Sequence, residues 1–145
     1  MLDLAFAIGH HLLVFALFGV LCAELIAVRR GMDAVAVARI AAVDLWYGVL
    51  AGLIVVVGFS RAVFAAKGWL YYEHNGFFWA KIATFATIGL LSIAPTVRFI
   101  VWRRTGVSPP DAAVATLRRY LYAEVALFAL LPAFAAAMAR GYGEF

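Results

Sequence analysis

Apolar residues dominate four stretches of the chain, at about residues 4–28, 41–64, 78–101 and 120–139. Each is long enough to cross the hydrocarbon core of a membrane as a helix, which takes about 20 mostly apolar residues. None alternates apolar and polar residues as a transmembrane β-strand does. The pattern therefore predicts an all-α integral membrane protein whose four spans pack as a four-helix bundle. A short interfacial helix over residues 111–119 is expected before the last span.

Small residues recur at helical spacing within the first two stretches. In the first, Gly9, Ala16 and Ala23 repeat every seven residues, and in the second Gly48 and Gly52 stand four apart. Small residues let membrane helices approach each other closely. We expect these sectors to face the interior of the bundle, and in an alternative arrangement to form contacts within a homo-oligomer such as a dimer.

The composition supports a membrane protein, because 67% of the residues are hydrophobic and only 14% are charged, against about 45–50% and about 25% in soluble domains. The four stretches leave no room for a separate soluble domain, so residues 1–145 are expected to form a single transmembrane domain. No basic segment precedes the first stretch, which is also long for a signal-peptide core, so we expect it to be retained. The single cysteine, Cys22, excludes an internal disulfide.

The net charge of +4 is distributed unevenly along the chain. Arginines gather around the first and third connections: Arg29, Arg30, Arg39, Arg98, Arg103, Arg104, Arg118 and Arg119. The second connection carries fewer basic residues: Arg61, Lys67 and Lys81. By the positive-inside rule, both termini lie outside a bacterial inner membrane. The charge is thus interpreted as a determinant of topology, and no nucleic-acid partner is expected.

Polar residues within the spans fall into two layers, and such residues usually mark functional sites. The outer layer holds His10, His11, Arg61, His74 and Lys81. His10 and His11 point about 100° apart on a helix, with His10 nearer the inward sector. The three histidines could bind zinc or copper if the outer loop folded back, or one or two of them could ligate a haem. Spacing does not separate these alternatives from interfacial side chains that reach water.

The inner layer lies toward the cytoplasmic side and holds Glu24, Asp44, Arg98 and Glu124. We expect the acids to form buried ion pairs with Arg98, Arg39 or Arg118. The functional alternative is a proton path or a substrate site at this end of the bundle. Ion pairing would be needed in both cases, because an unpaired charge is costly inside a membrane.

Several blocks of the chain resemble an uncharacterised bacterial family described only as predicted membrane proteins, notably DLWYG (residues 44–48) and LLSIAPT (residues 90–96). More distantly, the layout is similar to HemJ-type protoporphyrinogen IX oxidases and CopD-type membrane domains. In the HemJ family an early histidine of the first helix binds haem b, and a lysine in a Trp-x-x-Lys-Leu-like motif is functional. The matching positions are His10 or His11, and Lys81 in WAKI (residues 79–82).

This resemblance implies a b-type haem-binding, redox-linked membrane protein, which as an enzyme would be a haem-dependent oxidoreductase with a redox partner or quinone. His10 is then the preferred axial ligand, His11 or His74 the second, and Arg61 and Lys81 contact propionates. The residues leave two alternatives open. One is a copper- or other metal-handling or small-solute transport protein, and the other is an accessory subunit without chemistry. The lipid bilayer is the partner common to all three.

Overall fold

The computed structural model describes residues 2–64 and 68–145, and Lys67 lies outside them. The described residues form six helices: α1 (Leu2–Ala27), α2 (Ala34–Phe64), α3 (Gly68–Glu73), α4 (Gly76–Thr105), α5 (Asp111–Phe128) and α6 (Leu130–Ala139). Four segments are long and apolar enough to cross a membrane: Leu4–Ala27, Ala34–Phe64, Gly76–Thr105 and Asp111–Ala139. The predicted all-α membrane fold with four spans is confirmed.

The spans extend beyond the apolar stretches, because local capping sets where they begin and end. α2 begins at Ala34, ahead of the expected residue 41, since the Asp33 carboxylate accepts a hydrogen bond from the Ala36 N–H at 2.8 Å. α4 continues to Thr105, where Gly106 adopts the left-handed conformation (φ 65°) that ends many helices. Capping residues are polar or glycine, so a hydropathy pattern places these boundaries too far inside the helix.

The fourth span differs from the prediction in where it begins and in being interrupted. The expected short interfacial helix over 111–119 is instead the beginning of α5, which runs without a break to Phe128. The span is interrupted at Ala129, before α6. Pro132 explains the interruption, because it has no N–H to donate to the Phe128 carbonyl four residues earlier.

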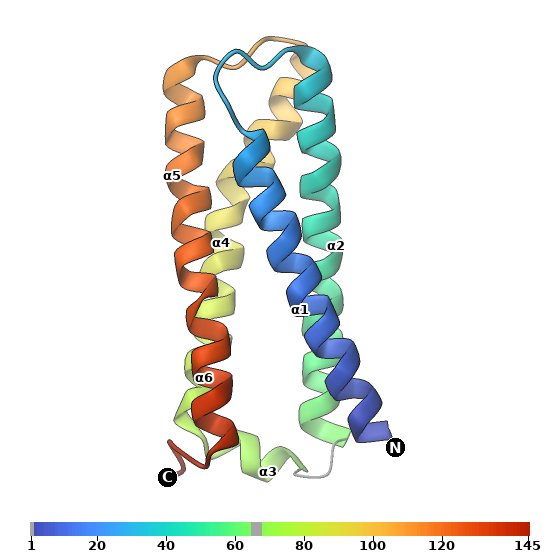
Figure 1. Ribbon diagram of the computed structural model, residues 1–145, viewed down its shortest axis with the longest axis vertical. Coiled ribbons are helices and arrows are strands. Elements are labelled where there is room, and N and C mark those ends of the chain that lie inside the picture. The colour runs from blue at the N-terminus through green and yellow to red at the C-terminus, as the bar shows by residue number, and fades with distance from the viewer. Residues whose placement is uncertain (1, 65–67) are drawn as a thin grey trace.

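The spans form an elongated bundle in which α2 and α4 lie side by side and α5 and α6 continue one another (Figure 1). The α1–α2 and α4–α5 connections lie at one end, which we call the basic end. Both termini and α3 lie at the other, which we call the terminal end. Among the described residues α1 contacts α2 and α5 but neither α4 nor α6, and it diverges from α6 toward the terminal end.

Large side chains, rather than the small-residue sectors, fill the interior. Leu17 and Leu21 of α1 are fully buried against α2 and α5, whereas Ala16 and Ala23 are exposed. A Cβ added to Gly48 or Gly52 would meet nothing within 4 Å. The expectation that small residues face inward is therefore wrong for Ala16, Ala23, Gly48 and Gly52. Leucines fill the space between the helices at these levels, where small residues would leave cavities.

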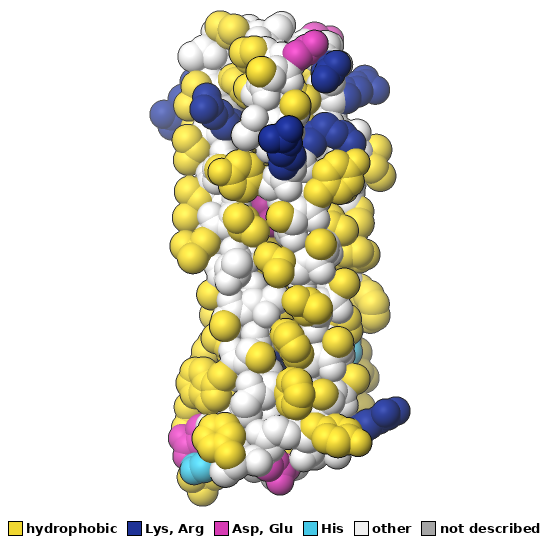
Figure 2. All heavy atoms as spheres, turned by 90° about the vertical axis from the view of Figure 1, so that its left-hand side faces the viewer, with side chains coloured by type: hydrophobic (Ala, Val, Ile, Leu, Met, Phe, Trp, Pro, Cys, Tyr) yellow, Lys and Arg dark blue, Asp and Glu magenta, His cyan; other side chains and the backbone are white. Residues whose placement is uncertain are grey.

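The outer surface matches a lipid environment. Figure 2 shows a wide hydrophobic belt over α4, α5 and α6, with a band of lysine and arginine side chains close to the basic end. Large apolar side chains are exposed along every span, among them Phe15 of α1, Val56 of α2, Leu90 of α4 and Leu130 of α6. So extensive an apolar surface is expected only where a protein contacts a bilayer. The chain is an integral membrane protein.

Candidate functional site

Three acidic side chains meet in the interior of the bundle, within the half nearer the basic end. Glu24 of α1, Asp44 of α2 and Glu124 of α5 are only 2%, 7% and 0% exposed. We call these three residues the carboxyl cluster. Asp44 lies about 15 Å along α2 from its first residue, at 1.5 Å per residue. Asp44 therefore lies well inside α2, whereas Glu24 lies in the last turn of α1, which ends at Ala27.

Neutral hydroxyl groups from α2 and α4 complete the cluster. The Thr96 hydroxyl donates to Asp44 Oδ1 at 2.7 Å, and the Tyr47 hydroxyl donates to Glu124 Oε2 at 3.2 Å. The Glu24 side chain lies close enough to Asp44 and to Glu124 for the three acids to interact electrostatically. In the described part of the chain, Oε1 of Glu24 and Oε1 of Glu124 are buried without a partner. All four spans thus contribute a polar group, and two acceptor positions stay open.

The expected ion pairs with Arg98, Arg39 or Arg118 do not form among residues 2–64 and 68–145. Arg98 and Arg39 are exposed. Arg118 donates instead to the backbone carbonyls of Leu25 and Val28. Long basic side chains near a helix end can reach water or the headgroups, which removes the cost of burying their charge.

A hollow of about 680 Å³ opens on the surface between α2 and α4, and it reaches the carboxyl cluster at Asp44. Asp44 and Thr96 line its inner part, and Arg103 and Arg104, in the last turn of α4, line it near the basic end. Gly48 also lines it, so no side chain of α2 fills the space at that position. Of the three acids, Asp44 is the one that borders this hollow.

The outer layer contains one inward-facing histidine. His10 is half-buried on α1, and a Cβ built on Gly58 of α2 would lie 3.2 Å from its Cε1. Its Nδ1 is buried without a partner in the described part of the chain, as is Nε of Arg61. Lys81 and Arg61 lie within electrostatic range of the His10 ring. We call these three residues, His10, Arg61 and Lys81, the cationic cluster; they are three of the five residues that the sequence places in the outer layer.

The other two histidines lie apart from this cluster. His11 is exposed, and its Nδ1 contacts the Ala7 carbonyl at 2.6 Å. His74 is exposed, with Nδ1 3.0 Å from the Leu70 carbonyl and 3.6 Å from Glu73 Oε1. Over the described residues no three His, Cys, Asp or Glu side chains are arranged to hold a metal ion. The histidines therefore do not fit a three-ligand zinc or copper site. His11 and His74 contact backbone carbonyls of their own segments, whereas His10 faces α2.

Two members of the inner site were missed by sequence reasoning. Tyr47 and Thr96 are uncharged hydroxyl residues within apolar spans, so the search for charged residues inside the membrane does not find them. A signal was nevertheless present for Tyr47, which lies three residues after Asp44 and therefore on the same helical face. Thr96 had no comparable signal, because its partner lies on another helix.

Comparison with known proteins gives one match. A family described as "Predicted membrane protein (DUF2214)" matches residues 2–143. No curated protein and no solved structure gives a significant match. The distant similarity to HemJ-type and CopD-type proteins therefore stays an expectation from sequence.

Proposed function

We propose that this chain, which belongs to the DUF2214 family of predicted membrane proteins, binds a proton at the carboxyl cluster and exchanges it with the basic side of the membrane. The observation that carries the proposal is the surroundings of Glu24, Asp44 and Glu124. Within the described residues Asp44 and Glu124 accept hydrogen bonds from hydroxyl groups, Glu24 lies beside them, and none of the three acids forms a salt bridge with a cation. Acids so placed in a membrane protein are typical of proton relays.

The closeness of Glu24 to Asp44, two buried acids, supports the proton as the bound species. Two ionised carboxylates offer only acceptors, so a hydrogen bond between them needs a proton on one of the two. Three ionised carboxylates so close together and without a cation would repel one another strongly in a low dielectric. A proton held by this pair lowers that repulsion, and the open oxygens of Glu24 and Glu124 are acceptors to which it can move.

Access to the cluster supports exchange with one side. The hollow between α2 and α4 connects Asp44 with the region of Arg103 and Arg104. On the other side of the cluster, toward the terminal end, the interior is filled by buried Leu17 and Ile88. The arrangement is that of a half-channel, as in a proton-coupled transporter of small solutes. Crossing to the terminal end would require the helices to move.

Labelling with an apolar carbodiimide tests the proposal, because this reagent reacts with protonated carboxyl groups in a membrane. We expect Asp44 to be modified in protein reconstituted into vesicles. The modification should fall as the pH rises in the compartment that the basic end of the bundle faces. Mass spectrometry of the digested protein locates the adduct.

Asp44→Asn should abolish this labelling, whereas Asp111→Asn, which changes an exposed acid at the start of α5, should leave it intact. An adduct found only on exposed acids, or one at Asp44 that does not depend on pH, would contradict proton binding at the cluster.

A second candidate function, haem binding at the cationic cluster, is favoured by the unpartnered Nδ1 of His10 and Nε of Arg61. His10 would serve as the axial ligand, and Arg61 and Lys81 would pair with the propionates. A bound haem b would supply one-electron chemistry. The position of His74 does not favour it as a second ligand, and the adjacent His11 is exposed.

Absorption spectra of the purified, haem-supplemented protein test this candidate. We expect a Soret band that His10→Ala removes and His11→Ala keeps. The absence of the band in the unmodified protein, or its equal loss in both variants, would exclude His10 ligation.

We further propose that the protein lies in a bacterial inner membrane with both termini outside. The basis is the positive-inside rule applied to the arginines of the basic end. A homo-oligomer is also proposed, since the exposed Gly52, which does not line the hollow, leaves room beside α2 for a second helix.

A further inference from the structure

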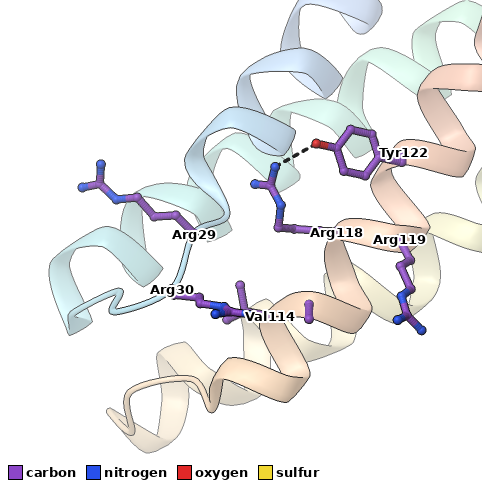
Figure 3. A pocket seen from close by; sticks show the side chains of 7 residues that line it. Arg29, Arg30, Val114, Arg118, Arg119 and Tyr122 are labelled. Atoms are coloured by element: carbon purple, nitrogen blue, oxygen red, sulfur yellow. Dashed lines mark hydrogen bonds between the residues drawn. The ribbon is translucent and has the colours of Figure 1, made fainter.

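Four arginines surround a hollow at the basic end, apart from the carboxyl cluster. The hollow has a volume of about 530 Å³ and lies between the end of α1 and the first half of α5 (Figure 3). We call it the arginine hollow. It is lined by Arg29, Arg30, Val114, Ala115, Arg118, Arg119 and Tyr122. The residues come from segments far apart in sequence, so no local pattern indicates the site.

The positive charge of the arginine hollow is not neutralised by the protein. In the part of the chain that the structure describes, none of its arginines forms a salt bridge. Arg118 bonds to backbone carbonyls and, at 3.0 Å, to the Tyr122 hydroxyl, all of which are neutral groups. Asp33 is an acid in the neighbouring α1–α2 loop, but its carboxylate accepts a hydrogen bond from the Ala36 N–H and forms no salt bridge with these arginines among the described residues.

Several arginines that line one hollow favour a phosphate group, toward which the exposed side chains can turn. The planar fork of arginine matches two oxygens of a phosphate, and the hydrogen bonds are charge-assisted. Arg29, Arg30 and Arg119 are exposed and so have free donors to offer, while Figure 3 shows Arg118 between them with its guanidinium directed to Tyr122.

The apolar part of the site distinguishes a lipid from a free phosphate ion. Val114 and Ala115 line the hollow beside the arginines. The α5 face that carries Arg118 continues toward the membrane centre with Tyr122, Ala126 and Ala129, all exposed. A ligand that fits both parts has an anionic head and an apolar tail. Basic pockets at the ends of membrane helices bind such lipid headgroups.

We propose that the arginine hollow binds the headgroup of an anionic phospholipid. The phosphodiester lies between Arg29 and Arg30 on one side and Arg119 on the other, and an acyl chain follows α5 past Tyr122. The site is independent of proton or haem binding, because it shares no residue with either cluster.

Native mass spectrometry of detergent-purified protein tests the proposal by titration with phosphatidylglycerol, with phosphatidylcholine, and with inorganic phosphate alone. We expect phosphatidylglycerol to bind in preference to phosphatidylcholine, and inorganic phosphate at equal concentration not to displace it. A basic residue beside an anionic headgroup contributes about fivefold to binding. Arg119→Gln should therefore weaken phosphatidylglycerol about fivefold, and Arg29→Gln/Arg30→Gln/Arg119→Gln on the order of 100-fold.

The matched control is Arg98→Gln/Arg103→Gln/Arg104→Gln, which removes three exposed charges of the basic end that do not line this hollow. It should keep the preference for phosphatidylglycerol. An equal loss in the control and in the triple variant of the arginine hollow would overturn the proposal, since binding would then follow net charge alone. Competition by free phosphate as strong as by the lipid would overturn the assignment to a lipid. The single Arg119→Gln variant gives the same decision if the triple variant of the arginine hollow does not fold.

Discussion

At the scale of single residues, the interior of this protein gives two of its three buried acids a neutral donor. Thr96 and Tyr47 donate to Asp44 and Glu124, while the arginines of the same end stay at the surface. A hydroxyl needs little desolvation compared with a guanidinium, so burying it in a membrane costs less. The arrangement holds the acids in place without fixing their charge, as a group that exchanges a proton requires.

Replacing Thr96 by valine should destabilise the protein because the buried Asp44 carboxyl loses its donor. The expected loss in the free energy of unfolding is about 1–3 kcal/mol. Thr87→Val is the matched control, since the Thr87 hydroxyl is exposed and donates to the Ala83 carbonyl of its own helix. It should change stability by no more than about 0.5 kcal/mol. Thermal unfolding in detergent measures both, and equal losses would show that the bond to Asp44 contributes nothing.

At the scale of elements, the end of α1 determines how the basic end is closed. α1 stops at Ala27, and the following loop places Val28 and Met32 in the core, 0% and 2% exposed. Arg118 of α5 donates to the Leu25 and Val28 carbonyls, which have no partner further along the helix. A cation at this position also interacts favourably with the helix dipole. One side chain thereby joins the first and fourth spans.

Arg118→Gln should lower the free energy of unfolding by about 1.5–3 kcal/mol, the range for hydrogen bonds to a charged group. The neighbouring Arg119 is exposed and has no bond of this kind among the described residues, so Arg119→Gln should have little effect. Unfolding should be followed in a neutral detergent without anionic lipid, so that headgroup binding does not contribute. A result in which both variants unfold alike would rule out Arg118 as the cap of α1.

At the scale of the whole molecule, the even number of spans brings both termini to one end and the basic connections to the other (Figure 1). The carboxyl cluster and its hollow lie toward the basic end, whereas His10, Arg61 and Lys81 lie toward the terminal end. The acidic and the basic cluster are thus separated along the bundle, and the orientation of the chain decides which compartment each one meets.

Reporter fusions should place the termini outside. Alkaline phosphatase fused after Phe145 should be active and a fluorescent protein at the same position dark, because each reporter matures on one side of the inner membrane. Fusions after Gly106, in the third connection, should behave in the opposite way. The reverse pattern at both positions would contradict the orientation and would place the carboxyl cluster near the outer face.

The sequence by itself determined the class of the protein, the number of spans and the identity of the costly residues. These follow from the length of apolar runs and from the rarity of charges such as Glu24 and Asp44 within them, which are properties of the chain. The partners of those residues were decided by the tertiary structure. Tyr47 and Thr96 replaced the expected arginines, and the glycine sectors turned outward.

The reason is physical. Helical periodicity fixes which residues share a face, but every span here is apolar all round, so the pattern only weakly indicates which face packs inward. That choice depends on how side chains from different helices fill the space between them. The same packing brings Arg29 and Arg30 beside Arg118 and Arg119, a juxtaposition that no local pattern contains.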